Sequence, residues 1–164
     1  MQVFEAIKTR RSTRSFKKDD VTPQQLEKIL EAGRWAPSGL NNQPWKFKTL
    51  SENEKKIVSG FTKYRKILEQ APAAIAVFMD TKLSYNRDKD VLSIGACIQN
   101  MLLETHEQGL GGLWMGEILN QKEKVREALH LPETLELMAV IAVGHPSEEK
   151  PETVRKNLSE LMLY

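Results

Sequence analysis

Residues 10–16 of the chain read RRSTRSF and lie inside a basic stretch. Six basic side chains and no acidic one occur between Lys8 and Lys18. Like charges this close repel one another, whereas arginine presents a planar fork that grips phosphate oxygens in pairs. The sequence therefore favours a phosphate site over a solvated basic face, which is the alternative. The candidate phosphate-binding residues are Arg10, Arg11, Ser12 and Arg14.

Residues 36–45 form a second unusual segment, APSGLNNQPW. Its prolines, glycine and asparagines predict a loop rather than a helix or a strand. Gly39 permits close backbone approach, and the neighbouring hydroxyl and amide groups offer donors and acceptors to a flat, heteroatom-rich ligand. The same residue types also suit an ordinary Asx-turn between a helix and a strand. Residue types alone leave both interpretations open.

The spacing of apolar residues predicts the elements around these segments. We expect helices over residues 3–7, 22–33, 51–61, 91–108 and 120–129, with capping boxes at Thr22, Ser51 and Asn120. We expect strands over residues 45–49, 73–79, 110–115 and 137–143, and a last helical pattern over residues 154–161. Residues 81–90 read as a polar, mobile connection, and residues 63–66 as a solvated basic face. Because helices outnumber strands and do not alternate with them, the fold class is α+β.

Two features of the apolar pattern bear on assembly and packing. Residues 91–108 are apolar around more of the helix circumference than a surface helix needs, so this helix is either the core spine or part of a subunit interface. Trp35, Trp45 and Trp114 are interpreted as core aromatics.

Composition narrows the class of protein. The 164 residues suit one compact domain spanning residues 1–164, and a net charge of +2 argues against a nucleic-acid partner. The single cysteine, Cys97, excludes an intramolecular disulfide, and His106, His130 and His145 lack ligand-like spacing, so we expect no metal site. No signal-peptide pattern or membrane-length apolar run is present in the sequence, so we expect a cytoplasmic location and no membrane partner.

The two segments together resemble the nitroreductase-like FMN-dependent oxidoreductases. Residues 10–16 resemble the RRSxRxF opening of that family, and residues 36–45, about twenty-five residues later, resemble its APSxxNxQPW loop. Residues 95–103, GACIQNMLL, are similar to its GxAxQNLLL helix. Residues 109–116 resemble the strand that follows this helix, and residues 144–146 with Arg155 and Lys156 resemble the closing segment. The resemblance covers nearly the whole chain.

The resemblance implies a nitroreductase-like fold with a central, mostly antiparallel sheet flanked by helices, in a homodimer that holds FMN at its interface. Arg10, Arg11, Ser12 and Arg14 would hold the phosphate, ribityl and pyrimidine side, and Asn41 would reach the isoalloxazine from the same subunit. Pro37, Ser38 and Gly39 would come from the partner. Trp114, Met115 and Gly116 would lie beside the ring near N5, and Arg155 and Lys156 would close on the phosphate.

The implied activity is hydride transfer from NADH or NADPH, through FMN, to a small oxidised acceptor such as a nitroaromatic or a quinone, in a ping-pong cycle. We expect no catalytic side chain, because the flavin performs the hydride chemistry while the protein binds and orients it. The alternatives are a flavin-cleaving or reductive dehalogenating enzyme of the same fold, and a flavin-binding redox sensor without turnover.

Overall fold

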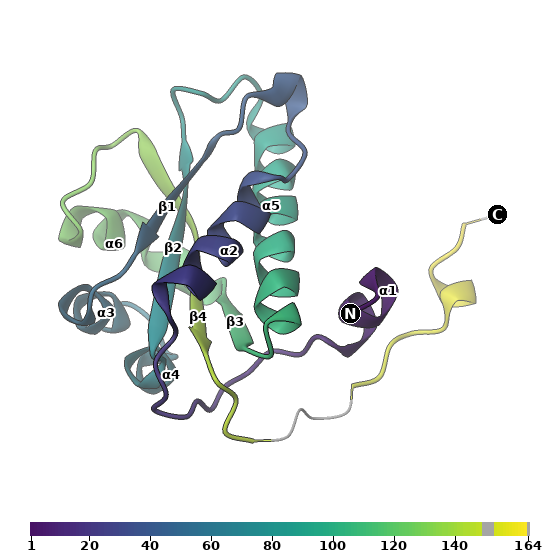
Figure 1. The fold of residues 1–164 in the computed structure, drawn as a ribbon. Coiled ribbons are helices and arrows are strands. Elements are labelled where there is room, and N and C mark those ends of the chain that lie inside the picture. The colour runs from purple at the N-terminus through teal and green to yellow at the C-terminus, as the bar shows by residue number, and fades with distance from the viewer. Residues whose placement is uncertain (149–152, 164) are drawn as a thin grey trace.

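A four-stranded antiparallel sheet in the order β1–β2–β4–β3 forms the centre of the protein (Figure 1). The computed structural model describes residues 1–148 and 153–163. The strands are β1 Trp45–Thr49, β2 Ala73–Asp80, β3 Gly111–Met115 and β4 Leu135–Gly144. All four were expected, and the antiparallel pairing agrees with the implied fold.

Helices cover both faces of the sheet (Figure 1). The α-helices are α1 Val3–Thr9, α2 Pro23–Arg34, α3 Glu52–Ser59, α4 Arg65–Gln70, α5 Arg87–Glu107 and α6 Lys122–Ala128. Short 3₁₀ turns occur at η1 Gly39–Asn41, η2 Glu117–Gln121 and η3 Leu158–Glu160. The capping boxes expected at Thr22 and Ser51 are both present, since each side-chain oxygen accepts the backbone N–H three residues on.

The core lies on the two faces of β2, which alternates its side chains between them. Ile75, Val77 and Met79 pack with α2 and α5 on one face. Ala74 and Phe78, with their neighbours, pack with α3, α4 and α6 on the other. This strand is therefore buried on both faces, as its continuous apolar run predicts.

Three local expectations are wrong. The Asn120 capping box is absent, because residues 117–121 form η2 and α6 begins only at Lys122 without a side-chain cap. No helix was expected over residues 65–70, which form α4 with Leu68 buried in the core, while Lys63, Arg65 and Lys66 are exposed, as the solvated basic face over residues 63–66 predicts. Within residues 153–163, only the three-residue turn η3 forms, because the apolar side chains around it are exposed and do not pack against the core of this chain.

Helix α5 is the longest element, with 21 residues and a length of about 30 Å. It begins at Arg87, four residues before the expected start, with Asn86 as its N-cap. One stripe, including Ile94 and Ile98, is buried against the sheet, so the core-spine interpretation holds for that stripe. Leu92, in contrast, is 76% exposed. Among the described residues, no helix is both long enough and apolar enough to span a bilayer.

Candidate functional site

The basic segment is fixed against β3, the edge strand of the sheet. Thr13 N donates to Gly112 O at 3.1 Å, and Ser12 forms a parallel bridge with Gly112. A Cβ at Gly111 would overlap the Thr13 side chain, so glycine is needed for this close approach. Further along, Lys17 N donates to the carbonyl that follows β4, at 2.8 Å. These contacts hold the arginines beside the sheet rather than on a free loop.

The arginines line a cavity of about 250 Å³. Its walls are Arg10, Arg11, Ser12, Arg14, Thr153 and Arg155, so four guanidinium groups and two hydroxyls meet with no carboxylate in the described lining. The Nε of Arg10 is buried without a hydrogen-bond partner. Burial, with Arg11 and Arg155 nearby, lowers the pKa of Arg10. A partly buried guanidinium with an unpaired N–H donor is unfavourable, and a bound phosphate would satisfy it.

The candidate arginines do not all have the same surroundings. Helix α1 ends at Thr9, so Arg10 and Arg14 do not share a helical face. Arg11 Nη1 donates to Lys8 O at 2.7 Å and to Arg10 O at 2.9 Å, so this guanidinium also caps the helix carbonyls. Arg155 reaches the cavity, whereas Lys156 is exposed and is not part of the lining.

The free edge of β3 offers backbone groups to a ligand. Gly112 O points away from β4, because it accepts from Thr13. Since backbone groups alternate along a strand, the N–H group of Trp114 faces the same free edge, and Gly116 follows directly after the strand. Met115 has a fully buried side chain, and the Trp114 side chain is 42% exposed, which corrects its interpretation as a core aromatic. A ligand at this edge would therefore contact backbone groups and the indole of Trp114, but not the side chain of Met115.

The loop over residues 36–45 has an unusual backbone. Leu40, Asn41 and Gln43 have φ values of 55°, 54° and 48°, in the left-handed region that favours glycine. Such residues each cost on the order of 1–3 kcal/mol and cluster at ligand sites. Two hydrogen bonds hold the loop from inside: Gln43 N donates to Ser38 Oγ at 3.0 Å, and Gln43 Nε2 donates to Asn41 O at 3.1 Å. An ordinary Asx-turn does not explain this strain.

Comparison with known proteins agrees with this geometry. The model of the Nitroreductase family matches residues 7–68 and 57–145. The chain belongs to the nitroreductase family. A relative from Archaeoglobus fulgidus, provisionally named NADH dehydrogenase/NAD(P)H nitroreductase, is 36% identical over 154 residues, which cover 91% of this chain and 88% of the relative.

Two further matches extend the range of relatives. A nitroreductase structure from Desulfovibrio desulfuricans, solved in complex with FMN, superposes with a TM-score of 0.96 at 41% identity and covers 100% of this chain and 96% of that chain. An iodotyrosine deiodinase from Thermotoga neapolitana is 27% identical, over 95% of both chains. The family and the fold expected from the sequence are confirmed.

The two halves of the candidate site lie at opposite ends of α5 in this nitroreductase chain. Asp90, in the first turn of α5, accepts a hydrogen bond from Asn42 of the loop at 2.8 Å. His106, in the last turn, lies 2.8 Å from the hydroxyl of Thr9, next to the arginine segment. These helix positions are sixteen residues apart, which is about 24 Å along the axis. Asn41 belongs to the same loop as Pro37, Ser38 and Gly39, which contacts the opposite end of α5 from the segment that leads into the arginines.

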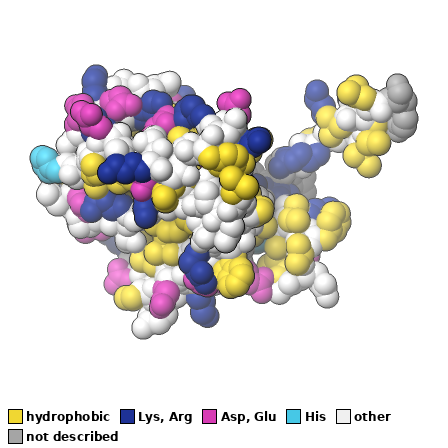
Figure 2. All heavy atoms as spheres, turned by 90° about the horizontal axis from the view of Figure 1, so that it is seen from above, with side chains coloured by type: hydrophobic (Ala, Val, Ile, Leu, Met, Phe, Trp, Pro, Cys, Tyr) yellow, Lys and Arg dark blue, Asp and Glu magenta, His cyan; other side chains and the backbone are white. Residues whose placement is uncertain are grey.

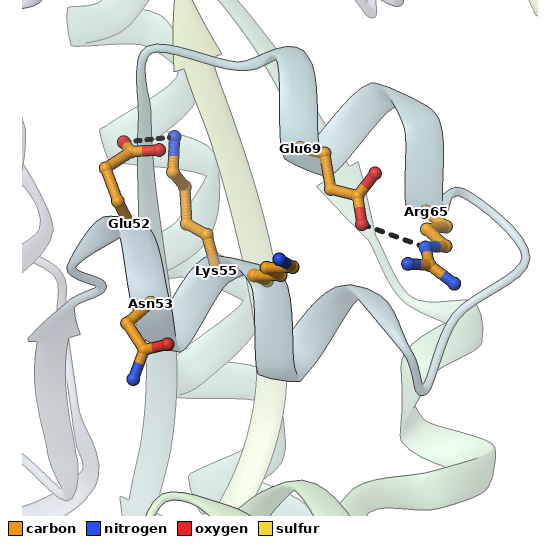
Figure 3. A pocket seen from close by; sticks show the side chains of 6 residues that line it. Glu52, Asn53, Lys55, Arg65 and Glu69 are labelled. Atoms are coloured by element: carbon orange, nitrogen blue, oxygen red, sulfur yellow. Dashed lines mark hydrogen bonds and ion pairs between the residues drawn. The ribbon is translucent and has the colours of Figure 1, made fainter.

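A second cavity shows by contrast what is unusual about the arginine cavity. Between α3 and α4, a space of about 480 Å³ is lined by Glu52, Asn53, Lys55, Lys56, Arg65 and Glu69 (Figure 3). Here two of the three basic groups are paired with carboxylates: Lys55 lies 2.7 Å from Glu52, and Arg65 lies 2.8 Å from Glu69. The lining of this larger cavity thus contains carboxylates that offset its basic groups, whereas the described lining of the arginine cavity contains none.

Several other residues can be placed. Glu117 Oε2 accepts from Thr62 Oγ1 at 2.7 Å and from Lys63 N at 3.2 Å, so this carboxylate is held by the connection between α3 and α4. Trp35 is 73% exposed rather than in the core, and its Nε1 donates to Glu31 at 2.7 Å. Among residues 1–148 and 153–163, no group of His, Cys, Asp or Glu is arranged to hold a metal ion.

Sequence reasoning missed two contributors to the site. Thr153 lines the arginine cavity, and no local pattern marks it. Asp90 is 0% exposed and is bonded to the loop, although residues 81–90 were expected to be a mobile connection. Its position in the first turn of a helix, four residues after an asparagine N-cap, is the one local signal that could have found it.

Proposed function

We propose that this nitroreductase binds FMN and transfers a hydride from NADH or NADPH to a small oxidised acceptor such as a nitroaromatic or a quinone. The observation that carries the proposal is the cavity with four guanidinium groups, in which the buried Nε of Arg10 has no partner. That donor set fits a phosphate group. The FMN complex of a relative 41% identical over the whole chain supports the same assignment.

Each part of the site then has a role. Arg10, Arg14 and Arg155 hold the phosphate, and Ser12 adds a hydroxyl donor. The backbone N–H groups at the free edge of β3 lie beside the ring system. When bound, FMN supplies the hydride chemistry at N5.

The site is completed by a second copy of the chain. Within one chain, the loop that contains Pro37, Ser38, Gly39 and Asn41 and the segment that leads into the arginines contact α5 at two positions about 24 Å apart along the helix axis. In a two-fold dimer with antiparallel α5 helices, the loop of one chain covers the flavin held by the arginines of the other. We therefore assign Asn41, with Pro37, Ser38 and Gly39, to the partner side of each flavin.

Exposed apolar side chains support such an interface. They lie on α1, just before the loop and within it, near the start of α5, and in the C-terminal segment, which stands clear of the body (Figures 1 and 2). They include Val3, Phe4, Ile7, Trp35, Leu40, Leu92, Leu158, Leu161 and Leu163. Large apolar side chains that gather on an exposed surface are typical of protein interfaces.

The test combines light scattering with flavin absorbance on one sample. We expect a dimer with one FMN per chain, whose flavin band bleaches when NADH or NADPH is added. Leu92→Glu should give a folded monomer that loses FMN, because Leu92 is exposed in the single chain. Ile57→Glu on α3, also an exposed apolar position, is the matched control and should keep both the dimer and the flavin. A monomer of 18.7 kDa that retains stoichiometric FMN would contradict the shared site.

The second candidate is reductive dehalogenation of a small haloaromatic substrate. The observation that favours it is the likeness to an iodotyrosine deiodinase over 95% of both chains. Reoxidation of the reduced protein by a nitroaromatic, a quinone and an iodophenol, each tested separately, distinguishes the two activities. A protein that no acceptor reoxidises beyond the rate with oxygen alone would instead act as a redox sensor.

A further inference from the structure

Asp90 is a buried carboxylate with four hydrogen-bond donors. Its Oδ1 accepts from Asn42 Nδ2 at 2.8 Å. Its Oδ2 accepts from Ser84 Oγ at 2.6 Å, from Tyr85 N at 3.1 Å and from Asn86 N at 3.3 Å. Three of these donors belong to the segment before α5, and the fourth belongs to the loop over residues 36–45. One side chain therefore joins the loop to the start of α5.

Capping of α5 alone does not explain this arrangement. Asn86 already caps the helix, because its Oδ1 accepts from Lys89 N at 3.1 Å. Asn42 uses both of its N–H groups in the same place, donating to Asp90 and, at 3.0 Å, to Leu83 O. Its own Oδ1 is left buried without a donor. The carboxylate of Asp90 and the carbonyl of Leu83 thus orient the Asn42 amide, although this orientation leaves the Asn42 Oδ1 without a hydrogen bond.

The contact with Asn42 falls at the strained part of the loop. Asn42 lies between Asn41 and Gln43, which both have positive φ. The segment bound to Asp90 meets the loop at a second point, because the hydroxyl of Tyr85 lies so close to Gly39 that a Cβ there would overlap it. The loop therefore meets groups bound to Asp90 at two points, Gly39 just before its left-handed residues and Asn42 among them.

We propose that Asp90 is a positioning residue for the flavin site, which acts by holding Asn42 and thereby fixing the conformation in which the loop contacts the flavin. The inference rests on the proposed function, since it requires the loop to touch FMN. Asp90 itself is buried and does not touch the flavin. Several donors hold the pKa of this carboxyl below its usual range against the effect of burial, so it stays ionised and keeps all four hydrogen bonds.

Two alanine variants, each of which removes one hydrogen-bond donor of the same carboxylate, form the test. Asn42→Ala removes the donor from the loop, and Ser84→Ala removes a donor from the other side. Each variant and the wild-type protein are freed of flavin and titrated with FMN, with quenching of FMN fluorescence as the readout. Thermal unfolding of the flavin-free proteins is measured in parallel. Asp90→Asn, which keeps the size of the side chain, is added as a third variant.

We expect Asn42→Ala to raise the FMN dissociation constant about tenfold or more, which corresponds to about 1.4 kcal/mol. Ser84→Ala should stay within about threefold of wild type. Both variants should lose similar thermal stability, since each loses one hydrogen bond to a charged group, and in Asn42→Ala the further loss of the bond to Leu83 O is offset by removal of the buried, unpaired Oδ1. Asp90→Asn, where it folds, should weaken FMN binding at least as much as Asn42→Ala.

The outcomes separate the inference from the function beneath it. If Asn42→Ala binds FMN as tightly as wild type, or if Asn42→Ala and Ser84→Ala weaken binding equally, the network serves stability alone and the inference is overturned. If the wild-type protein itself binds no FMN, the proposed function fails, and the inference fails with it. Should Asp90→Asn not fold, the pair of alanine variants still decides.

Discussion

Replacing Arg10 with methionine should weaken FMN binding and, in the same protein, stabilise the flavin-free fold. The guanidinium lines the arginine cavity, and its Nε is buried without a partner. A hydrogen bond to a charged group contributes about 1.5–3 kcal/mol. At 1.4 kcal/mol per factor of ten, Arg10→Met should raise the FMN dissociation constant about tenfold to 150-fold.

The stabilising half of the prediction comes from the same geometry. A buried donor without a partner costs about 1–3 kcal/mol, and methionine removes that donor while keeping most of the apolar stem. Repulsion from Arg11 and Arg155, which together with burial lowers the pKa of Arg10, is also relieved. A gain of about 1 kcal/mol would raise the unfolding midpoint by roughly 2–4 °C for a chain of this size.

The assay pairs two measurements on each protein: FMN titration by fluorescence, and thermal unfolding without flavin. Lys18→Met is the control, because Lys18 is an exposed member of the same basic stretch outside the cavity. It should change neither quantity by much. If Arg10→Met destabilises the flavin-free protein, Arg10 contributes to the stability of the fold and the stabilising half of the prediction is wrong. If Arg10→Met leaves the FMN affinity unchanged, Arg10 is not part of the phosphate site.

Three other predictions concern single positions. His130 has a φ of 53° just after α6, so His130→Gly should stabilise the protein by about 0.5–1 kcal/mol in urea unfolding, whereas no gain would mean the backbone is not strained there. Burial alone would raise the pKa of Glu136. Hydrogen bonds from Lys122 and Arg87 lower this pKa by more than burial raises it, so the folded-state pKa is depressed. The ionised Glu136 therefore stabilises the folded protein above the ordinary glutamate pKa of about 4.3, and this stabilisation is lost as the pH falls through the folded-state pKa of Glu136. The deficit of Glu136→Gln in unfolding free energy should accordingly be present at about pH 7 and vanish in acid, and a pH-independent deficit would contradict this account. Burial raises the pKa of Cys97 to about 12, so iodoacetamide should modify this thiol only after denaturation, and rapid alkylation of the native protein would show that it is accessible.

Local signals in the sequence were enough for most of the fold. The capping boxes at Thr22 and Ser51 and the alternation in β1 act within a few residues, so the sequence pattern contains them. Helix α4 was missed because a six-residue helix is too short to show a clear period, and its buried Leu68 is identified only by packing. The Asn120 box failed because a 3₁₀ turn uses the same residues.

The candidate site divides in the same way. The arginine cluster could be predicted because six like charges repel one another in one short stretch, and this repulsion is visible in the sequence without knowledge of the fold. Asp90 could not, because its function depends on Asn42, forty-eight residues earlier in the chain. The exposure of Trp35 was also missed, since whether an aromatic side chain is covered depends on the surfaces around it rather than on its neighbours in sequence.

The two unfavourable features of the chain point to one thermodynamic consequence. Four guanidinium groups without a carboxylate lie near one end of α5, and a loop with three strained residues lies at the other. In one chain these features are too far apart to relieve each other, whereas in the proposed dimer each flavin brings an arginine cavity and a partner loop together. FMN would then bind the dimer in preference to the monomer, so added FMN should strengthen dimerisation by mass action. Affinity for the cofactor and affinity between the subunits would be one linked quantity, and a mutation that weakens either should weaken both.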